Sequence, residues 1–216
     1  MPDAPPPDDC LACSISIASK QSGALEILGN EVFGTAELMN EIVYALGTSG
    51  SGRFIASADS SLPFNEVSDC PIVEWLAGTG ASPKVLTFGW GPQDGPKQFS
   101  LPQETVAGIH LPAQYVGDPA QLAADFDIVV YMEGSGQFDQ GDQPTDAEMQ
   151  TVVDYVVSHG GGLYVVSEFY GYMNDADLES VNRIMEPLGV RALAVNLNWG
   201  NVAGNIDFTC FPNPAG

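Results

Sequence analysis

The stretch from residue 127 to 136 reads DIVVYMEGSG, and it decides the fold class. Apolar residues stand in an unbroken row before Glu133, and a Gly-Ser-Gly turn follows. A continuous apolar run is typical of a strand that is covered on both faces, as in a parallel sheet, whereas a half-exposed strand alternates. The stretch therefore predicts a buried strand that delivers a polar loop to one edge of a sheet.

Further short apolar runs predict neighbouring strands of the same kind. SPKVLTFG at 82–89 ends in glycine, and GLYVVS at 162–167 begins with the last of three consecutive glycines. GVRALAV at 189–195 is a fourth candidate. The spacing between these runs leaves room for a crossover helix, which parallel strands require.

Helices are predicted upstream of the strands and between them. In the longest, Thr145 and Glu148 fit a capping box, and apolar residues then recur at helical spacing. The predicted helices are TAELMNEIVYALG (35–47), CPIVEWLAG (70–78), TDAEMQTVVDYVVSHGGG (145–162) and DADLESVNRIMEPLG (175–189).

Alternating strands and helices predict an α/β fold with an open, doubly wound, mostly parallel sheet and an N-terminal extension. The 216 residues, 44% of them hydrophobic, suit one domain. The expected segments are a flexible Pro/Asp-rich lead-in at 1–14 and a single α/β domain at 15–216. Within that domain we expect an extension layer at 15–82, the core at 83–195 and a C-terminal loop segment at 196–216.

The charge balance excludes several partners. The chain has 28 acidic and 6 basic residues, for a net charge of −22. Nucleic acids and anionic membranes are bound through clustered Lys and Arg, which this chain lacks. No segment approaches the roughly 20 apolar residues needed to span a bilayer, so we expect no membrane insertion. The acidity fits either the solvated surface of an exported or salt-adapted protein or carboxylates gathered around divalent cations.

The cysteines and the N-terminal segment favour an oxidising compartment. Four cysteines allow up to two disulfides with three pairings, and Cys10 with Cys13 could instead form half of a metal site or a redox pair. The proline-rich and acidic start lacks the basic and apolar regions of a signal peptide, and we interpret it as what remains after an export signal is removed. We therefore expect a secreted, periplasmic or cell-surface protein.

Polar loops follow the three strongest strand predictions, and parallel strands deliver such loops to one edge of the sheet. We expect Trp90, Glu133 and Glu168 to be neighbours in a crevice there, with Glu168 exposed. The further candidate ligand-binding residues are Ser135, Gln137 and Tyr170. Glycine combined with amide, carboxyl and aromatic groups suits a polar ligand.

Calcium is the one cofactor that we consider. Asp139 and Asp142, in FDQGDQPTDAE, could supply oxygen ligands to this ion. The segment lacks the spacing of an EF-hand loop. Thr145 and Asp146 at its end are already explained by helix capping.

The residues from about 83 to 195 resemble the class I glutamine amidotransferase-like superfamily, which has a flavodoxin-like fold. The resemblance rests on DFDIVVYMEGSG, VVSHGGGLYVVSE and LESVNRIMEPLGV, and it is to the non-catalytic and trehalose-utilisation-type branches. It implies a cysteine nucleophile directly after the strand at 162–167. Here Ser167 and Glu168 stand in that place, and no cysteine lies between Cys70 and Cys210.

We therefore expect an exported, non-catalytic domain that binds a polar small molecule or a partner protein at the strand-end crevice. The alternative is a hydrolase or sugar-processing enzyme that uses Glu168 with a histidine. The sequence favours a packed strand position for His110 and a role at a helix end for His159. A structural cell-surface or assembly component is the third interpretation, and it requires only the fold and the acidity.

Overall fold

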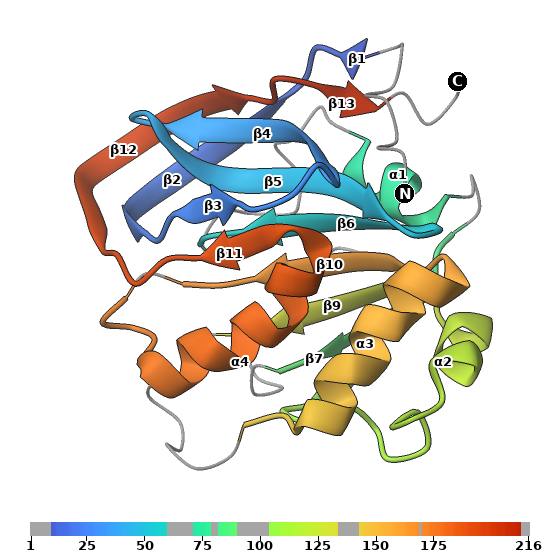
Figure 1. Ribbon diagram of the computed structural model, residues 1–216. Helices are drawn as coiled ribbons and strands as arrows, with labels where there is room; N and C mark the ends of the chain where they lie inside the picture. The colour runs from blue at the N-terminus through green and yellow to red at the C-terminus, as the bar shows by residue number, and fades with distance from the viewer. Residues whose placement is uncertain are drawn as a thin grey trace.

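A computed structural model gives the structure of the chain and describes residues 10–59, 71–78, 82–89, 104–133, 143–168 and 170–212. Its centre is a seven-stranded sheet with the strand order β4-β5-β6-β10-β9-β7-β8 (Figure 1). The strands are β4 (Val32–Leu38), β5 (Glu41–Ser49), β6 (Gly52–Ser57), β7 (Val85–Phe88), β8 (Glu104–Gly108), β9 (Ile128–Met132) and β10 (Gly162–Val166).

The sheet is mixed. From β6 to β8 all neighbouring strands are parallel, whereas β4 and β5 pair antiparallel to each other and β5 pairs antiparallel to β6. The predicted strands at 82–89, 127–132 and 162–167 are confirmed as β7, β9 and β10. Every residue of these three strands is buried, as their continuous apolar runs predict.

Helices cover the sheet on the face that carries Tyr131. The helices α3 (Asp146–His159) and α4 (Asp175–Met185) lie across this face, and α2 (Pro119–Asp125) packs beside α3 (Figure 1). The 3₁₀ turn η2 (Glu186–Leu188) continues α4. The structure is therefore a mixed α/β fold with a partly parallel sheet.

An aromatic cluster covers the opposite face. The short helix α1 (Ile72–Ala77) contributes Trp75, whose ring centroid lies 5.8 Å from that of Phe211. Phe211 contacts Phe208 at 5.5 Å, and Phe208 contacts Tyr44 of β5 at 5.8 Å. Edge-to-face pairs of this kind stabilise a core beyond the area that they bury.

Three two-stranded sheets accompany the central sheet among the described residues. They are formed by β1 (Cys10–Leu11) with β13 (Phe211–Pro212), by β2 (Ser14–Ser22) with β12 (Leu197–Asp207), and by β3 (Leu25–Ile27) with β11 (Val190–Ala192). A disulfide between Cys10 and Cys210 joins β1 to the chain just before β13. The prediction of structural disulfides is thus confirmed for this pair. Cys13 is also disulfide-bonded, and Cys70 lies outside the described residues.

Local signals explain where the two long helices begin. Thr145 and Glu148 form the predicted capping box of α3, and Gly160 ends the helix in a left-handed conformation. Asn174 and Asp177 form a second capping box at the start of α4. Each box satisfies backbone N–H groups that the first turn of a helix leaves without partners.

The predicted helix at 35–47 is wrong, because these residues form the hairpin of β4 and β5. Met39 and Asn40 make its turn with φ angles of 53° and 70°. The apolar residues of this segment recur at a spacing that suits either a helix or two paired strands. Pairing with β6 decides between them, since it adds β5 to the central sheet along six registered residue pairs.

The N-terminal segment also differs from expectation. Within the range 15–82, expected as an extension layer, β4, β5 and β6 belong to the central sheet itself. Conversely, the fourth strand prediction, at 189–195, yields only β11, which pairs antiparallel with β3 outside the central sheet. The position beside β10 is taken by β6, which comes earlier in the chain.

Candidate functional site

The carboxyl ends of β6, β10 and β9 meet at one edge of the sheet, hereafter the carboxyl edge. Backbone hydrogen bonds continue past the strand ends, from Glu133 N–H to the Val166 carbonyl at 2.8 Å and from Ser167 N–H to the Ser57 carbonyl at 2.8 Å. Glu133 and Ser167 therefore follow adjacent strands side by side. Glu168 is the next residue along.

Glu133 is a buried carboxyl residue, with only 3% of its surface exposed. The Tyr131 hydroxyl donates a hydrogen bond to Glu133 Oε2 and lies 3.1 Å from Ser180 Oγ of α4. Burial, and then the charge of Glu133, raises the pKa of Tyr131 well above its usual value. Tyr131 is thus a neutral hydrogen-bond donor that holds the carboxyl group of Glu133 against α4.

Glu168 is buried as well, with 5% of its surface exposed, so the expectation of an exposed glutamate is wrong. In the parallel register Glu168 lies opposite Asp59, which follows β6 and is 1% exposed. Strand alternation places these two residues on the face of Tyr164, whereas Glu133 continues the face of Tyr131. The two predicted glutamates therefore end adjacent strands but belong to opposite faces.

Residues 22–24, the end of β2 and its link to β3, lie at the carboxyl edge, beside the residues that follow β6 and β10. Gly23 N–H bonds to the Ala58 carbonyl at 2.9 Å, and Ala24 accepts a bond from Leu193 N–H at 3.0 Å. A Cβ atom at Gly23 would lie 2.9 Å from the Glu168 carbonyl oxygen, so only glycine allows this approach. We call residues 22–24 the strap. It packs against the backbone carbonyl of Glu168.

Of the remaining predicted site residues, only Tyr170 belongs to the described part of the chain. Tyr170 is partly buried, and its hydroxyl donates to Asp175 Oδ1 at 2.6 Å, at the start of α4. This bond turns the phenol toward the helix. The predicted residues that lie outside the described part of the chain are Trp90, Ser135, Gln137, Asp139 and Asp142.

The structure pairs His110 with Glu148, which the sequence had indicated only as part of a capping box. His110 Nδ1 lies 3.2 Å from Oε1 and 3.3 Å from Oε2 of Glu148, which is buried in the first turn of α3. The His110 side chain is 43% exposed, so it is not the packed strand residue that its apolar neighbours suggested. His159 lies in the last turn of α3, as predicted.

Two buried side-chain oxygen atoms among the described residues lack a hydrogen-bond partner, Oγ1 of Thr87 and Oε1 of Gln143. Gln143 Nε2 donates to Asp177 Oδ1 at 2.6 Å. Asp177 in turn is close enough to Tyr131 for its charge to help raise the pKa of that phenol. The Gln143 carbonyl therefore adds an unused acceptor beside the network of Tyr131 and Glu133.

The described part of the chain also bears on metal binding. There, no group of three or more His, Cys, Asp or Glu side chains is placed to hold a metal ion. The predicted calcium ligands, Asp139 and Asp142, belong to the residues that are not described. In the same part of the chain, no helix has the length and apolar character required to cross a membrane.

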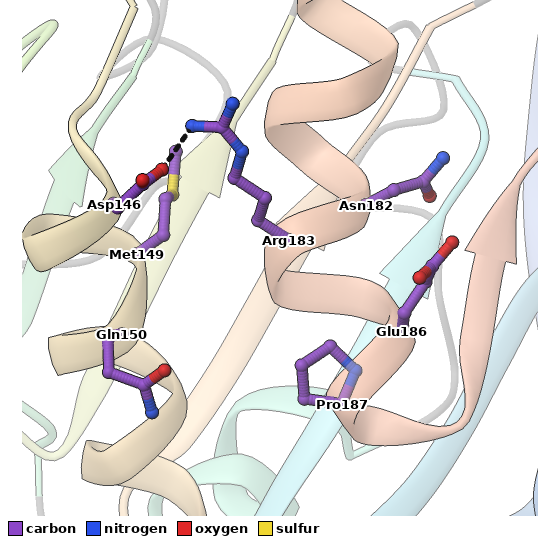
Figure 2. A pocket seen from close by; sticks show the side chains of 7 residues that line it. All are labelled: Asp146, Met149, Gln150, Asn182, Arg183, Glu186 and Pro187. Atoms are coloured by element: carbon purple, nitrogen blue, oxygen red, sulfur yellow. Dashed lines mark hydrogen bonds and ion pairs between the residues drawn. The ribbon is translucent and has the colours of Figure 1, made fainter.

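A surface groove of about 450 Å³ runs between α3 and α4 (Figure 2). Arg183 reaches from α4 across the groove and contacts Asp146 of α3 at 2.5 Å. Met149 supplies apolar surface next to this ion pair, and Pro187 supplies it at the other end of the groove. Sequence analysis did not find the groove, because it depends on how two separate helices pack.

Comparisons with protein-family models, with curated proteins and with solved structures found no match to this chain. The residues themselves therefore carry the functional argument.

Proposed function

We propose that this protein is an exported, non-catalytic α/β domain that binds a polar ligand at the carboxyl edge of its sheet. The observation that carries the proposal is the position of Glu133, a buried carboxyl residue at the end of β9. At this place the strand order reverses. The chain goes from β7 to β8 on one side, and then continues with β9 and β10 on the other side of β7. In open α/β sheets, ligands bind beyond the strand ends at such a reversal.

The strand order also supports a flavodoxin-like core. The order β8-β7-β9-β10 corresponds to the first four places, 2-1-3-4, of the flavodoxin-like order. The fifth place is filled by β6, which precedes the other four in the chain and runs parallel to β10. The core would thus be a circular permutation of that arrangement, in keeping with the resemblance to class I glutamine amidotransferase-like proteins.

The chemistry of the edge favours a ligand rich in hydrogen-bond donors. Glu133 and the orphan carbonyl oxygen of Gln143 are acceptors, and the carboxylate of Asp177 lies beside them. A polyhydroxyl compound or an amine offers the donors that such groups require. The strap covers the edge at β6 and β10, so we place the ligand at the β9 side.

The residues after β10 support the non-catalytic part of the proposal. Ser167 donates its hydroxyl to the Ser57 carbonyl at 3.0 Å and is buried, and Glu168, which follows it, is buried as well. Neither arrangement resembles the exposed nucleophile that acyl transfer requires. A hydrolase that uses Glu168 with a histidine remains the alternative, and the contact of His110 with Glu148 gives that histidine a different carboxylate partner.

Export is part of the same proposal. The disulfide between Cys10 and Cys210 is typical of proteins that mature in an oxidising compartment. We infer a secreted, periplasmic or cell-surface location, where a partner protein is a second class of ligand for the carboxyl edge.

A thermal-shift screen of sugars, polyols, amino acids and amines, with calcium or with a chelator, tests the proposal. A compound that binds the folded state must raise the unfolding midpoint. Glu133→Gln should reduce the shift that a hit produces, whereas Glu41→Gln, an exposed change on β5, should not. Hits that respond equally to both substitutions, or turnover of a hit by the wild-type protein, would refute binding without catalysis at this edge.

A further inference from the structure

The exposed side of α4 carries two adjoining grooves. The first, between α3 and α4, is the groove of about 450 Å³ shown in Figure 2. The second, of about 330 Å³, lies along α4 and adds Asp175, Leu178 and Glu179 to its lining. Both are lined by Asn182, Arg183 and Glu186, so they form one continuous strip, hereafter the α4 strip. Its length and openness suit a segment of polypeptide better than an enclosed small molecule.

The α4 strip is acidic. Its lining residues include four carboxylates, Asp146, Asp175, Glu179 and Glu186, and a single cation, Arg183. Arg183 is shared between Asp146 at 2.5 Å and Glu179 at 2.9 Å. Because these carboxylate side chains are 87% and 71% exposed, solvent reaches both and their ion pairs are weak. One shared guanidinium thus leaves the strip with an excess of negative charge.

The other contacts of the strip do not reverse this balance. Arg191 binds Glu186 at 2.7 Å from the side of β11, and the Tyr170 hydroxyl donates to Asp175 at 2.6 Å. Even with Arg191 included, the carboxylates outnumber the cations by four to two. The apolar surface of Met149 and Pro187 lies between the charged groups. Such a surface fits the aliphatic stem of lysine or arginine, with the charged head directed to a carboxylate.

We propose that the α4 strip is a docking surface for a lysine- or arginine-bearing segment of a partner protein. Charge complementarity selects this occupant. A second copy of the chain brings another −22 charges and is repelled, as is a nucleic acid. A cationic segment is attracted by the whole molecule and held by the strip. The strip is lined by other residues than those proposed to bind a ligand at the carboxyl edge, so the proposal does not depend on the function of that edge.

A defined peptide tests the proposal. The probe is the labelled peptide KAAKLAAK, acetylated and amidated, and the control is EAAELAAE. Fluorescence anisotropy is recorded at roughly physiological salt, where the screening length is about 8 Å and long-range attraction is damped. Backbone amide NMR shifts of the full chain then locate the bound peptide. We expect the cationic probe to bind and the largest shifts to fall within 146–150 and 178–187.

Matched variants separate docking from general attraction. Asp146→Asn with Glu186→Gln removes two charges from the strip, and Glu41→Gln with Asp207→Asn removes two exposed charges elsewhere. We expect Kd to rise at least about fivefold for the first pair and less than about twofold for the second. A thermal midpoint for each variant confirms that it is folded. Equal losses in the two pairs, shifts confined to other elements, or no binding by the wild-type protein would overturn the proposal.

Discussion

Gly23 donates its backbone N–H to the carbonyl oxygen of Ala58 at 2.9 Å, and this bond fixes the strap on the carboxyl ends of β6 and β10. The strap packs against the backbone of Glu168, a buried residue that the sequence had suggested would face solvent. A segment from the first quarter of the chain therefore limits the edge at which a ligand can bind.

The strap should tolerate no side chain at Gly23. Gly23→Ala places a methyl group 2.9 Å from the Glu168 carbonyl oxygen and 3.2 Å from the Ala58 carbonyl oxygen, both of them backbone atoms. We expect the free energy of unfolding to fall by about 1–3 kcal/mol, as for overpacking in a core. Urea denaturation followed by circular dichroism measures the change. An unaltered midpoint would show that the strap does not pack as described.

The disulfide joins Cys10 and Cys210, which are 200 positions apart in the sequence, and so closes a long loop. Replacing both cysteines with serine should lower the free energy of unfolding by about 2–5 kcal/mol, since the unfolded chain regains the entropy of that loop. Denaturant titrations of the variant and the wild type give the difference. Identical stabilities would mean that the terminal strands contribute nothing to the cooperative unit.

Stability should fall at alkaline pH. Burial raises the pKa of Tyr44, Tyr131, Tyr155 and Tyr164 above the usual value of 10.0. Above about pH 10 the unfolded chain releases protons that the folded chain retains, so stability present below that pH is lost as pH rises. The loss approaches about 1.4 kcal/mol per pH unit for each such tyrosine.

Two measurements check the alkaline prediction. Urea titrations on either side of about pH 10 give the slope of the free energy of unfolding against pH. The absorbance of phenolate from the buried tyrosines should appear together with unfolding, in one step. Tyr155→Phe should reduce this slope by the contribution of one buried tyrosine. Gradual ionisation of all tyrosines in the folded state would contradict their burial.

Asn182 joins α4 to β11 through two bonds to one residue. Its Oδ1 accepts from Ala192 N–H at 2.8 Å, and its Nδ2 donates to the Ala192 carbonyl at 3.1 Å. Asn182→Ala should cost about 1–3 kcal/mol, because it leaves two partly buried backbone groups without partners. Hydrogen exchange at Ala192 should accelerate in this variant. In Asn182→Asp the acceptor remains, so Ala192 N–H should stay protected; fast exchange there would disprove the role given to Oδ1.

Local patterns were sufficient for part of the fold. The strands that became β7, β9 and β10 are continuous apolar runs, and the start of α3 carries its capping box in the sequence itself. These signals lie within a few residues of one another, so they can be found without knowing the rest of the chain. The hairpin of β4 and β5 could not be found in this way, since its apolar residues also fit a helix and only the contact with β6 selects the strands.

The sequence by itself determined that polar residues follow the parallel strands at one edge of the sheet, because strand direction and loop composition are local properties. Only the tertiary structure decided what those residues do. Glu133 and Glu168 follow neighbouring strands, yet register and alternation assign them to opposite faces, and both are buried. His110 meets Glu148 across 38 positions of sequence. Burial and pairing of this kind arise from contacts between distant segments, which no local pattern contains.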